Sequence, residues 1–580
     1  MTRDTSSSLQ TLSRRSVLAA LLTTATLSAA GGAAGAKAGS RDGSPPRSRE
    51  QTGAVWPQPP PVLPLPSRYG PEGPPPPLGG QPSPGSAPPP TDPRLVAAQD
   101  HALLYGPFPR GGLARGISDS SLILSRDAEV RQLALVRMRA TGASVVRIPV
   151  EWRYIVSSSP PAGFDAVDPA SPAYTFTAVD AAVRDTVAAG LTPLLVVTRA
   201  PAFAEAPGRW PYAYPGSWAP SPVAFGQFAT AVARRYDGRV PDPLQPGRAL
   251  PRVRLLEAWN EPNLARYLEP QWVVEHGRWR PFSPLIYRQL LNAFFTAVKA
   301  VEPSDVVITA GVAPNGEPAG VGRMTPVRFL EALLCIEGTA RGGCLDPPHF
   351  DVLTLHPLSF ASPDRAAASS QDIAISDVPK ATTLLARAER AGTALPRARK
   401  PVWVTELNWE SDPPAVRGVP GRLQAQWISR ALHRLWVAGI GLADWQFLID
   451  PYPGVSLATP TGGTIEVSRP AGLYSPGPGG DVAAARPKPF LRGFTFPFDP
   501  LRVNRRHVRV WALLTRAGQT VTLQRQTRTG GAWRTVARLR SGGNYVLNAL
   551  ISLTGAARLR LRSGALISAP AAVPSRQSRL

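Results

Sequence analysis

From about residue 94 to residue 500, short apolar runs alternate with segments of helical periodicity. Eight runs are strand-like: Arg115–Ser118, Val145–Val150, Leu191–Val197, Val253–Trp259, Val306–Gly311, Val352–Leu355, Val402–Thr405 and Leu442–Leu448. Helical spacing lies between them at Ala128–Ala140, Ala178–Ala189, Val223–Tyr236, Pro284–Val301, Val327–Ile336, Ala381–Ala391 and Arg422–Ala438. Strands that are apolar on both faces and alternate with helices are typical of a parallel sheet covered on both sides. Eight such units, with no G-x-G-x-x-G segment at the first helix, predict an α/β fold of the (β/α)8 TIM barrel type.

The pattern changes near Pro500. From residue 501 to residue 580 apolar residues alternate with polar ones at period two, as where Leu559 and Leu561 are flanked by Arg558, Arg560 and Arg562. This is strand periodicity with the guanidinium groups on the solvent face. Glycines at 518, 530–531 and 542–543 mark turns between about five short strands. A small C-terminal all-β sandwich domain is therefore expected after the barrel.

Charge is concentrated in this last segment. The 580-residue chain has 64 Lys and Arg against 40 Asp and Glu, a net charge of +24, and only five of the cations are lysines. Residues 501–580 hold fifteen arginines and no Lys, Asp or Glu. A GC-rich coding sequence and selection for polyanion binding both explain this bias. No nucleic-acid-binding motif is present, so the candidate partner of the Arg-rich domain is an anionic cell-envelope polymer.

The N-terminal region has the features of an export signal. Residues 13–18 read Ser-Arg-Arg-Ser-Val-Leu and resemble the twin-arginine translocation motif. The apolar stretch 17–30 that follows is too short and too rich in Ala and Thr to span a bilayer securely. Small-residue cleavage sites follow at 34–36 and 36–38. We expect a cleaved signal over residues 1–38 and no stable membrane span afterwards; the alternatives are a chance Arg pair and an uncleaved anchor.

A proline-rich segment follows the signal. Nineteen prolines lie between residues 43 and 93, with few large apolar residues. Such a composition favours solvated polyproline II and cannot form a core, which predicts a disordered linker over residues 39–93. It serves either as a spacer from a membrane or cell wall or as a passive tail. Together, signal and linker predict a secreted or cell-envelope-associated protein.

The two cysteines, Cys335 and Cys344, are nine positions apart. In an exported protein this pair is expected to form a disulfide that closes a short loop. Two thiols without a His or Cys at ligand spacing make a poor metal site, and neither has an evident base that would make it a nucleophile.

Two carboxylic acids follow the ends of barrel strands. Glu261 lies in the pentapeptide Trp259–Asn263, which ends the fourth strand-like run, and Glu406 ends the seventh. The C-terminal ends of barrel strands form the rim where loops build an active site. Glycoside hydrolysis uses two carboxyl groups in one cleft, one to protonate the leaving oxygen and one to attack or to activate water. Mutual repulsion and partial burial would raise the pKa of one of them and keep it protonated.

These motifs resemble those of a known enzyme group. The segments LLEAWNEPN and VWVTELNW, whose glutamates are 406 − 261 = 145 positions apart, are similar to clan A glycoside hydrolases, in particular to family 39 β-xylosidase-like and family 5 cellulase-like proteins. The resemblance covers roughly residues 94–498. It implies a retaining (β/α)8 enzyme in which Glu261 is the acid/base and Glu406 the nucleophile, with no metal or cofactor.

Four further residues match positions of the clan. The resemblance implies that Arg147, in VVRIPVEW, lies beside the nucleophile and that Asn260 bonds the sugar 2-hydroxyl. It places His356, in LTLHPL, near the nucleophile and Trp445, in LADWQF, under the −1 sugar. The third strand departs from the pattern, because it ends in Thr-Arg-Ala-Pro without the His of many family 5 members.

Structural roles remain open for these residues. Arg147 is alternatively an ion-pair partner of Glu151 or Asp180, and Asn260, His356 and Trp445 are alternatively groups that fix the barrel mouth by turn formation, hydrogen bonding or packing.

The loop after the third strand concentrates aromatic residues. Trp210, Tyr212, Tyr214 and Trp218 fall within nine positions. Apolar sugar faces stack on such rings, so Trp210 and Trp218 are candidate substrate-binding residues; the alternative is that they anchor the loop by packing.

The sequence therefore predicts an exported retaining glycoside hydrolase acting on a polysaccharide or oligosaccharide. Its catalytic barrel would span residues 94–500 and its Arg-rich β-sandwich residues 501–580. The alternative is a non-catalytic carbohydrate-binding protein of the cell envelope on a glycosidase-like barrel.

Overall fold

The computed structural model of the protein describes residues 111–337, 344–451, 456–458, 464–466 and 469–575. The expected export signal (1–38) and Pro-rich linker (39–93) lie outside the described residues. Within the described residues, every helix is too short or too polar to cross a bilayer.

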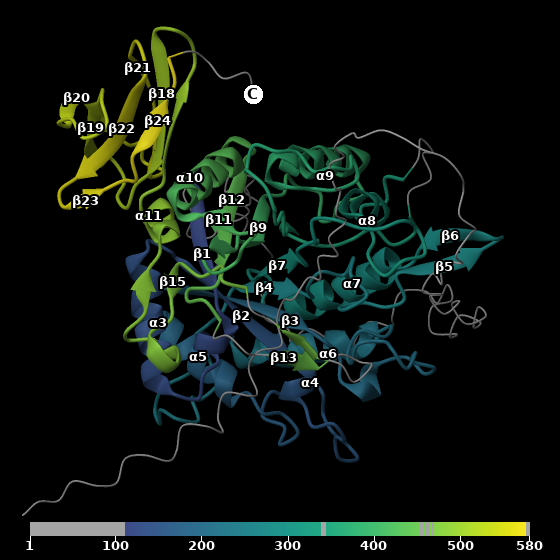
Figure 1. Cartoon of the computed structure of the whole chain (residues 1–580). Helices are drawn as coiled ribbons and strands as arrows, with labels where there is room; N and C mark the ends of the chain where they lie inside the picture. Colours follow the sequence, from purple (N-terminus) through teal and green to yellow (C-terminus); the bar gives the residue numbers. More distant parts are fainter. Residues whose placement is uncertain (1–110, 338–343, 452–455, 459–463, 467–468, 576–580) are drawn as a thin grey trace, which may run out of the picture. The chain divides into compact units, whose positions relative to one another are not determined.

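Eight parallel strands form the first sheet (Figure 1). Their bounds are β1 (Ala114–Ser118), β2 (Val145–Glu151), β3 (Thr192–Thr198), β4 (Leu255–Ala258), β7 (Val306–Thr309), β8 (Leu353–Leu355), β9 (Val402–Leu407) and β12 (Ile440–Gln446). The order in the sheet is β7-β4-β3-β2-β1-β12-β9-β8. Parallel bridges from Ile308 to Val352 and from Val312 to Leu355 join the two outer strands. The sheet closes on itself, and the predicted TIM barrel is confirmed.

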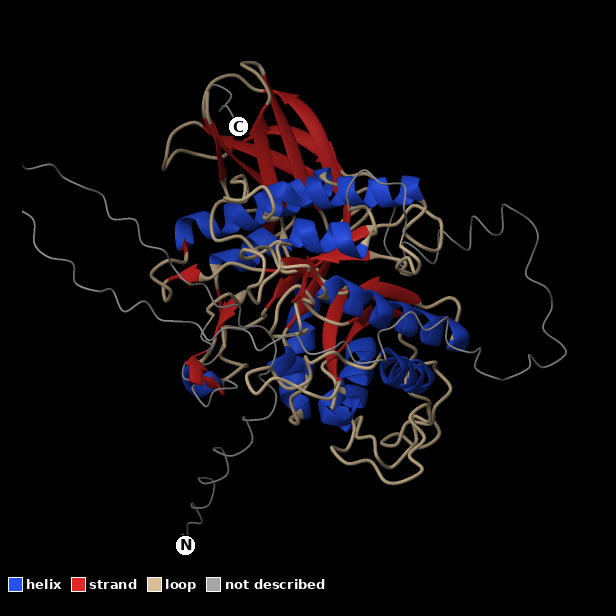
Figure 2. Cartoon of the chain, turned by 90° about the vertical axis from the view of Figure 1, so that its right-hand side faces the viewer, coloured by secondary structure: helices blue, strands red, loops and turns tan. Residues whose placement is uncertain are grey.

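Helices follow the strands and surround them (Figure 2). The longer ones are α3 (Ala128–Ala140), α5 (Thr177–Ala188), α6 (Pro222–Arg235), α7 (Ser283–Val301), α8 (Pro326–Leu333), α9 (Val378–Ala391) and α10 (Gly421–Val437). Short helical segments are α2 (Ser120–Ile123), α4 (Trp152–Ile155), α11 (Pro489–Thr495), η2 (Ala202–Ala204), η3 (Ile375–Asp377) and η4 (Pro478–Gly480). Each long helix lies within a few residues of its predicted range.

Local chemistry sets several helix ends. The Asp127 carboxylate accepts a hydrogen bond from the backbone N–H of Glu129 at 2.9 Å and caps α3. Ser221 caps α6 in the same way through the N–H of Ala224 at 3.3 Å. Helix α9 ends at Gly392, whose φ of 74° is left-handed and therefore suits glycine.

The barrel interior changes from apolar to polar along the strands. Its apolar layer is formed by Val145, Leu194, Leu255, Val306, Ile308, Val352, Trp403 and Leu442. Two positions further along its strand each, Arg147, Glu257 and Asp444 follow Val145, Leu255 and Leu442. Since side chains two apart on a strand share a face, these charged groups lie above the apolar layer, toward the rim of loops.

Four two-stranded ribbons decorate the barrel and were not expected from the sequence. They pair β5 (Trp272–Glu275) with β6 (Arg278–Pro281), β10 (Ser411–Asp412) with β11 (Val419–Pro420), β13 (Ser456–Ala458) with β14 (Thr464–Glu466), and β15 (Tyr474–Ser475) with β16 (Arg486–Pro487).

The C-terminal segment forms two antiparallel sheets, as predicted. One contains β17 (Phe498–Arg502), β18 (His507–Leu513) and β21 (Val546–Ser552). The other contains β19 (Thr520–Gln526), β20 (Arg534–Arg540), β22 (Ala557–Ser563), β23 (Leu566–Ile567) and β24 (Ala571–Val573). Buried residues of both sheets, among them Val508, Val510, Leu523, Leu559 and Leu561, form one shared core.

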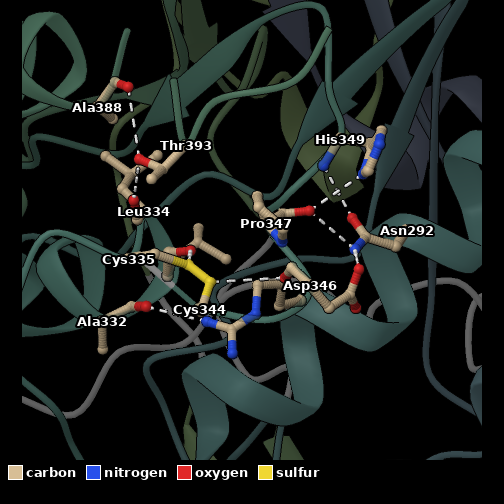
Figure 3. The surroundings of a disulfide bond; sticks show 12 residues. Asn292, Ala332, Leu334, Cys335, Cys344, Asp346, Pro347, His349, Ala388 and Thr393 are labelled. Carbon is tan, nitrogen blue, oxygen red and sulfur yellow. Dashed lines mark hydrogen bonds between the residues drawn. A yellow bond between two sulfur atoms is a disulfide. The ribbon is translucent and has the colours of Figure 1, made fainter. Parts of the chain in front are cut away.

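Cys335 and Cys344 form the predicted disulfide just after α8 (Figure 3). The adjoining backbone is held by side chains of two helical regions. The Thr393 hydroxyl donates to the carbonyl of Leu334 at 2.7 Å. The Asn292 amide donates to the Asp346 carboxylate at 2.7 Å. The disulfide thus staples a segment that is also fixed by hydrogen bonds on either side.

Candidate active site

Strand ends bring the two predicted glutamates together. Glu261 lies three residues beyond the end of β4 and Glu406 lies in β9, and both are buried. Nδ1 of His356, just after β8, is 3.0 Å from Glu261 Oε1 and 3.8 Å from Glu406 Oε2. One carboxylate oxygen of each glutamate and one ring nitrogen of His356 lie within 4.8 Å of one another. These three residues form the acid cluster at the barrel mouth.

The turn that carries Glu261 has unusual backbone geometry. Trp259 has a φ of 79° and Glu261 a φ of 39°, left-handed values that cost energy for residues other than glycine. The Trp259 indole N–H donates to the Tyr267 carbonyl at 3.0 Å, and the Glu261 N–H donates to the Gly311 carbonyl at 3.1 Å. These bonds hold the turn in place, and backbone strain of this kind is typical of functional sites.

Arg147 on β2 connects four residues of the site. Its guanidinium donates to Glu406 Oε1 at 2.8 Å, to Glu257 Oε2 at 2.6 Å and to Asn260 Oδ1 at 2.8 Å. All of these side chains are buried. A planar guanidinium with several donors is well suited to such a role. Arg147 therefore fixes the orientation of Glu406 and of the Asn260 amide at once.

The residues considered as alternative partners of Arg147 pair elsewhere. Asp180 forms an ion pair with Arg235 at 2.5 Å. Glu151 lies 3.8 Å from Arg153 and 4.0 Å from Arg199.

The second oxygen of Glu406 also has a donor. The Gln446 amide, at the end of β12, donates to Oε2 at 3.1 Å. The Gln446 carbonyl oxygen in turn accepts from the Asn408 amide at 2.5 Å. Both oxygens of Glu406 thus accept hydrogen bonds from side chains that are themselves held.

His356 is fixed on both sides of its ring. Its Nδ1 is at hydrogen-bond distance from Glu261, and its Nε2 lies 3.1 Å from the Thr405 hydroxyl. The Thr405 hydroxyl also lies 3.2 Å from Glu257 Oε1. A Cβ at Gly311 would collide with the His356 ring, so glycine at this position leaves room for it.

Burial and neighbouring charges shift the proton affinities of the cluster. Burial raises the pKa of Glu406 above its ordinary value; the charges of His356 and Arg147 lower it, and those of Glu261 and Glu257 raise it. Burial alone would lower the pKa of His356, but Glu406 and the hydrogen bond with Glu261 outweigh it and the pKa is raised. The cluster therefore holds protons jointly.

Asp444 on β12 is a further buried acid beside the site. Burial raises its pKa well above the ordinary value, and the negative charges of Glu406 and Glu257 add to this effect. Its carboxyl group lies where a Cβ of Gly116, on the neighbouring strand β1, would be. Asp444 is consequently a neutral acid around neutral pH.

The three predicted tryptophans contact other groups. Trp445 is fully buried, its indole donates to the Ala471 carbonyl at 2.9 Å, and its ring centre lies 5.2 Å from that of Phe490. Trp210 and Trp218 contact one another, with ring centres 4.7 Å apart. Trp218 is buried and Trp210 is half-buried. Of the predicted site residues, Arg147, Asn260, Glu261, His356 and Glu406 are brought together.

Sequence reasoning missed four members of the site: Glu257, Thr405, Asn408 and Gln446. Strand alternation holds the signal for two of them. Glu257 is two positions after the interior residue Leu255, and Gln446 is two positions after Asp444, so each shares the inward face of its strand.

The acid cluster also has the composition of a small metal site, since Glu and His donate oxygen and nitrogen ligands. However, Nδ1 of His356 is hydrogen-bonded to Glu261, and the Arg147 cation lies 2.8 Å from Glu406. A permanent positive charge at this distance opposes the binding of a metal cation. The geometry fits an acid–base cluster better than a metal centre.

No protein-family model and no curated protein matches the chain. Among solved structures, a family 39 glycoside hydrolase from the gut symbiont Bacteroides cellulosilyticus WH2 is similar, with 17% identity, 76% of this chain and 81% of that chain covered, and a TM-score of 0.44. A GH39 β-xylosidase from Caulobacter crescentus shows 15% identity, 76% and 96% coverage and a TM-score of 0.41. A conserved exported protein from Bacteroides fragilis shows 10% identity, 77% and 98% coverage and a TM-score of 0.42.

Proposed function

We propose that the chain is a retaining glycoside hydrolase that cleaves O-glycosidic bonds of a polysaccharide or oligosaccharide. The observation that carries this proposal is the approach of Glu261 and Glu406, whose nearest ligand atoms lie within 4.8 Å with His356. Carboxyl groups about 5 to 5.5 Å apart are typical of retention, whereas inverting enzymes need about 6.5 to 9.5 Å to admit a water.

Glu406 is the proposed nucleophile. Hydrogen bonds from Arg147 and Gln446 hold its two oxygens and stabilise the ionised form that attacks. Attack on the anomeric carbon forms a bond from a Glu406 oxygen to the sugar as the bond to the leaving oxygen breaks.

Glu261 is the proposed acid and base. Its Oε1 contacts His356, while its Oε2 is buried and has no hydrogen-bond partner among the described residues. Oε2 is therefore the oxygen available to give a proton to the leaving group. In the second step the Glu261 carboxylate takes a proton from water, which attacks the anomeric carbon and releases Glu406.

Asn260 is the proposed partner of the sugar 2-hydroxyl. Because Arg147 donates to Oδ1, the amide is oriented with Nδ2 free, and this nitrogen is buried without a partner among the described residues. An unmade hydrogen bond of a buried donor is costly, and a substrate hydroxyl would satisfy it.

Secretion or attachment to the cell envelope is proposed with the activity. The Cys335–Cys344 disulfide supports it, because such bonds persist mainly in oxidising compartments.

The test compares the wild type with Glu406→Ala and Glu261→Gln on a panel of aryl glycosides, with the exposed Glu129→Gln as a matched control. Loss of either carboxyl is expected to lower kcat by about 10³-fold or more on substrates with poor leaving groups. On 2,4-dinitrophenyl glycosides, which leave without acid assistance, Glu261→Gln is expected to retain its first step and Glu406→Ala is not.

Proton NMR of the first product formed decides the stereochemistry. Retained anomeric configuration is expected, and inverted product would overturn the double displacement. Turnover that survives Glu406→Ala would overturn the nucleophile assignment. Saccharide binding without turnover by the wild type would favour a non-catalytic carbohydrate-binding protein instead.

A further inference from the structure

One face of the C-terminal domain is covered with arginine. In the sheet that contains β19, β20 and β22, the inward side chains Val521, Leu523, Leu559 and Leu561 are buried in the core. The alternate positions point outward and include Arg538 and Arg540 of β20 and Arg558, Arg560 and Arg562 of β22. We call this the arginine face.

Strand register arranges these side chains in rows. Thr522 of β19 pairs with Arg538 on one side and with Arg562 on the other. Gln524 pairs with Arg560 in the next row. Rows are about 6.7 Å apart along a strand, and neighbouring strands about 4.8 Å apart. The guanidinium groups therefore form a regular array around a central strand of neutral polar residues.

The array has no acidic counterpart. Residues 501–580 contain no Asp or Glu, and among the described residues no carboxylate lies within 4.0 Å of a guanidinium of this face. Mutual repulsion is evident at Arg560, whose pKa is lowered by burial and by the charge of Arg562. A bound anion would relieve this repulsion.

Hydrogen-bonding groups accompany the charges. The Gln524 amide oxygen accepts from Arg560 at 2.8 Å, and that of Gln526 accepts from Arg558 at 3.3 Å. Arg560 also lies over the ring of Trp533 at 4.2 Å. Each guanidinium has five N–H donors, so these contacts orient the arginines and leave further donors for a ligand.

This composition favours an anionic glycan over nucleic acid. Proteins that bind single-stranded nucleic acid present several aromatic rings on which successive bases stack. Trp533 is the aromatic residue of this face among the described residues, and Arg560 covers its ring. Threonine, glutamine and arginine side chains are instead suited to hydroxyl and carboxylate groups repeated along a chain.

We propose that the arginine face is a binding site for a carboxylated linear polysaccharide, separate from the acid cluster of the barrel. It would hold the protein on such a polymer while the barrel acts, and it does not depend on the activity proposed above.

The test measures binding of the full chain to polygalacturonate, with pullulan as a neutral glycan and oligo(dT) as a nucleic acid. The variant Arg538→Gln/Arg560→Gln/Arg562→Gln removes three charges of the face. The control Arg505→Gln/Arg506→Gln/Arg516→Gln removes three exposed charges from turns of the same domain. Thermal unfolding of both variants checks that the domain stays folded.

Salt-sensitive binding to polygalacturonate but not to pullulan is expected, weakened about tenfold or more by the face variant and less than about twofold by the control. Equal losses in the two variants would reduce the effect to net charge and overturn the site. Tighter binding of oligo(dT) than of polygalacturonate would overturn the ligand class. Aryl glycoside turnover is expected to be unchanged in both variants, so the outcome does not bear on the catalytic proposal.

Discussion

Glu269, in the loop between β4 and β5, shows how one buried side chain can set the pH dependence of stability. Burial raises its pKa to about 8 from an ordinary value near 4.5. The folded protein therefore binds this proton more tightly than the unfolded chain does. Glu269 does not affect stability below about pH 4.5, and its effect becomes more unfavourable as pH rises toward 8, where the folded state must accept a buried charge.

We predict that Glu269→Gln raises stability at pH 8 and changes it little at pH 5. The gain at pH 8 is on the order of 3 kcal/mol, since each unit of pKa shift corresponds to about 1.4 kcal/mol. Differential scanning calorimetry at the two pH values measures it as a gap in Tm. Glu302→Gln is the control of opposite sign, because the hydrogen bond from Ser304 lowers the pKa of Glu302. A gap in Tm that is equal at pH 5 and pH 8 would contradict the prediction.

Single residues also show what the sequence could predict of the site. Arg147, Glu261, His356 and Glu406 stand in motifs at strand ends, and these motifs were sufficient to place them together. Motifs do not say which side chain of a strand end faces inward. Trp445 and Gln446 are adjacent in β12, yet Gln446 contacts Glu406 while Trp445 packs against Phe490 and the Ala471 backbone. The inward face follows from strand pairing, which a single sequence does not provide.

At the scale of elements, the ends of β7 and β8 position His356 through a close contact. Gly311 follows β7, and a Cβ there would overlap the His356 ring that follows β8. Gly311 has no left-handed backbone, so alanine is conformationally allowed and the clash is the main consequence.

We predict that Gly311→Ala displaces His356 from Glu261 and lowers kcat by about 10²-fold, because a misplacement near 1 Å has effects of this size. The pH–rate profile should change shape as well, since His356 shares protons with both glutamates. Gly421→Ala is the matched control, as its Cβ would meet only Pro489 at 4.0 Å. A normal profile in Gly311→Ala would show that the ring tolerates the methyl group.

The elements themselves were predictable to different degrees. Barrel strands are apolar on both faces and helices have an amphipathic period, so both were found within a few residues. The ribbon of β5 and β6 was missed because four residues are too few to show a period, although His276-Gly277, both left-handed, form the turn between them. Its only sequence signal is that dipeptide.

At the scale of the molecule, α10 links the barrel to the three-stranded sheet of the C-terminal domain. Asp499 of β17 accepts hydrogen bonds from His433 at 2.6 Å and Arg430 at 3.1 Å, both on α10. The His433 ring stacks on Trp511 of β18 with centres 4.7 Å apart. The same helix follows β9, which carries Glu406, so this contact joins the C-terminal domain to the scaffold of the site.

We predict that Asp499→Asn loosens this junction. It leaves His433 and Arg430 without their shared carboxylate and costs about 1 to 3 kcal/mol, the range for a buried hydrogen bond to a charged group. Calorimetry is expected to show unfolding of the C-terminal domain before that of the barrel, while aryl glycoside turnover persists below the first transition. Asp237→Asn, which removes a pair with the largely exposed Arg239, should change stability by less than about 0.5 kcal/mol. A single transition at the wild-type Tm in Asp499→Asn would mean that the stacked rings and the remaining contacts of α10 are enough to make the two domains unfold together.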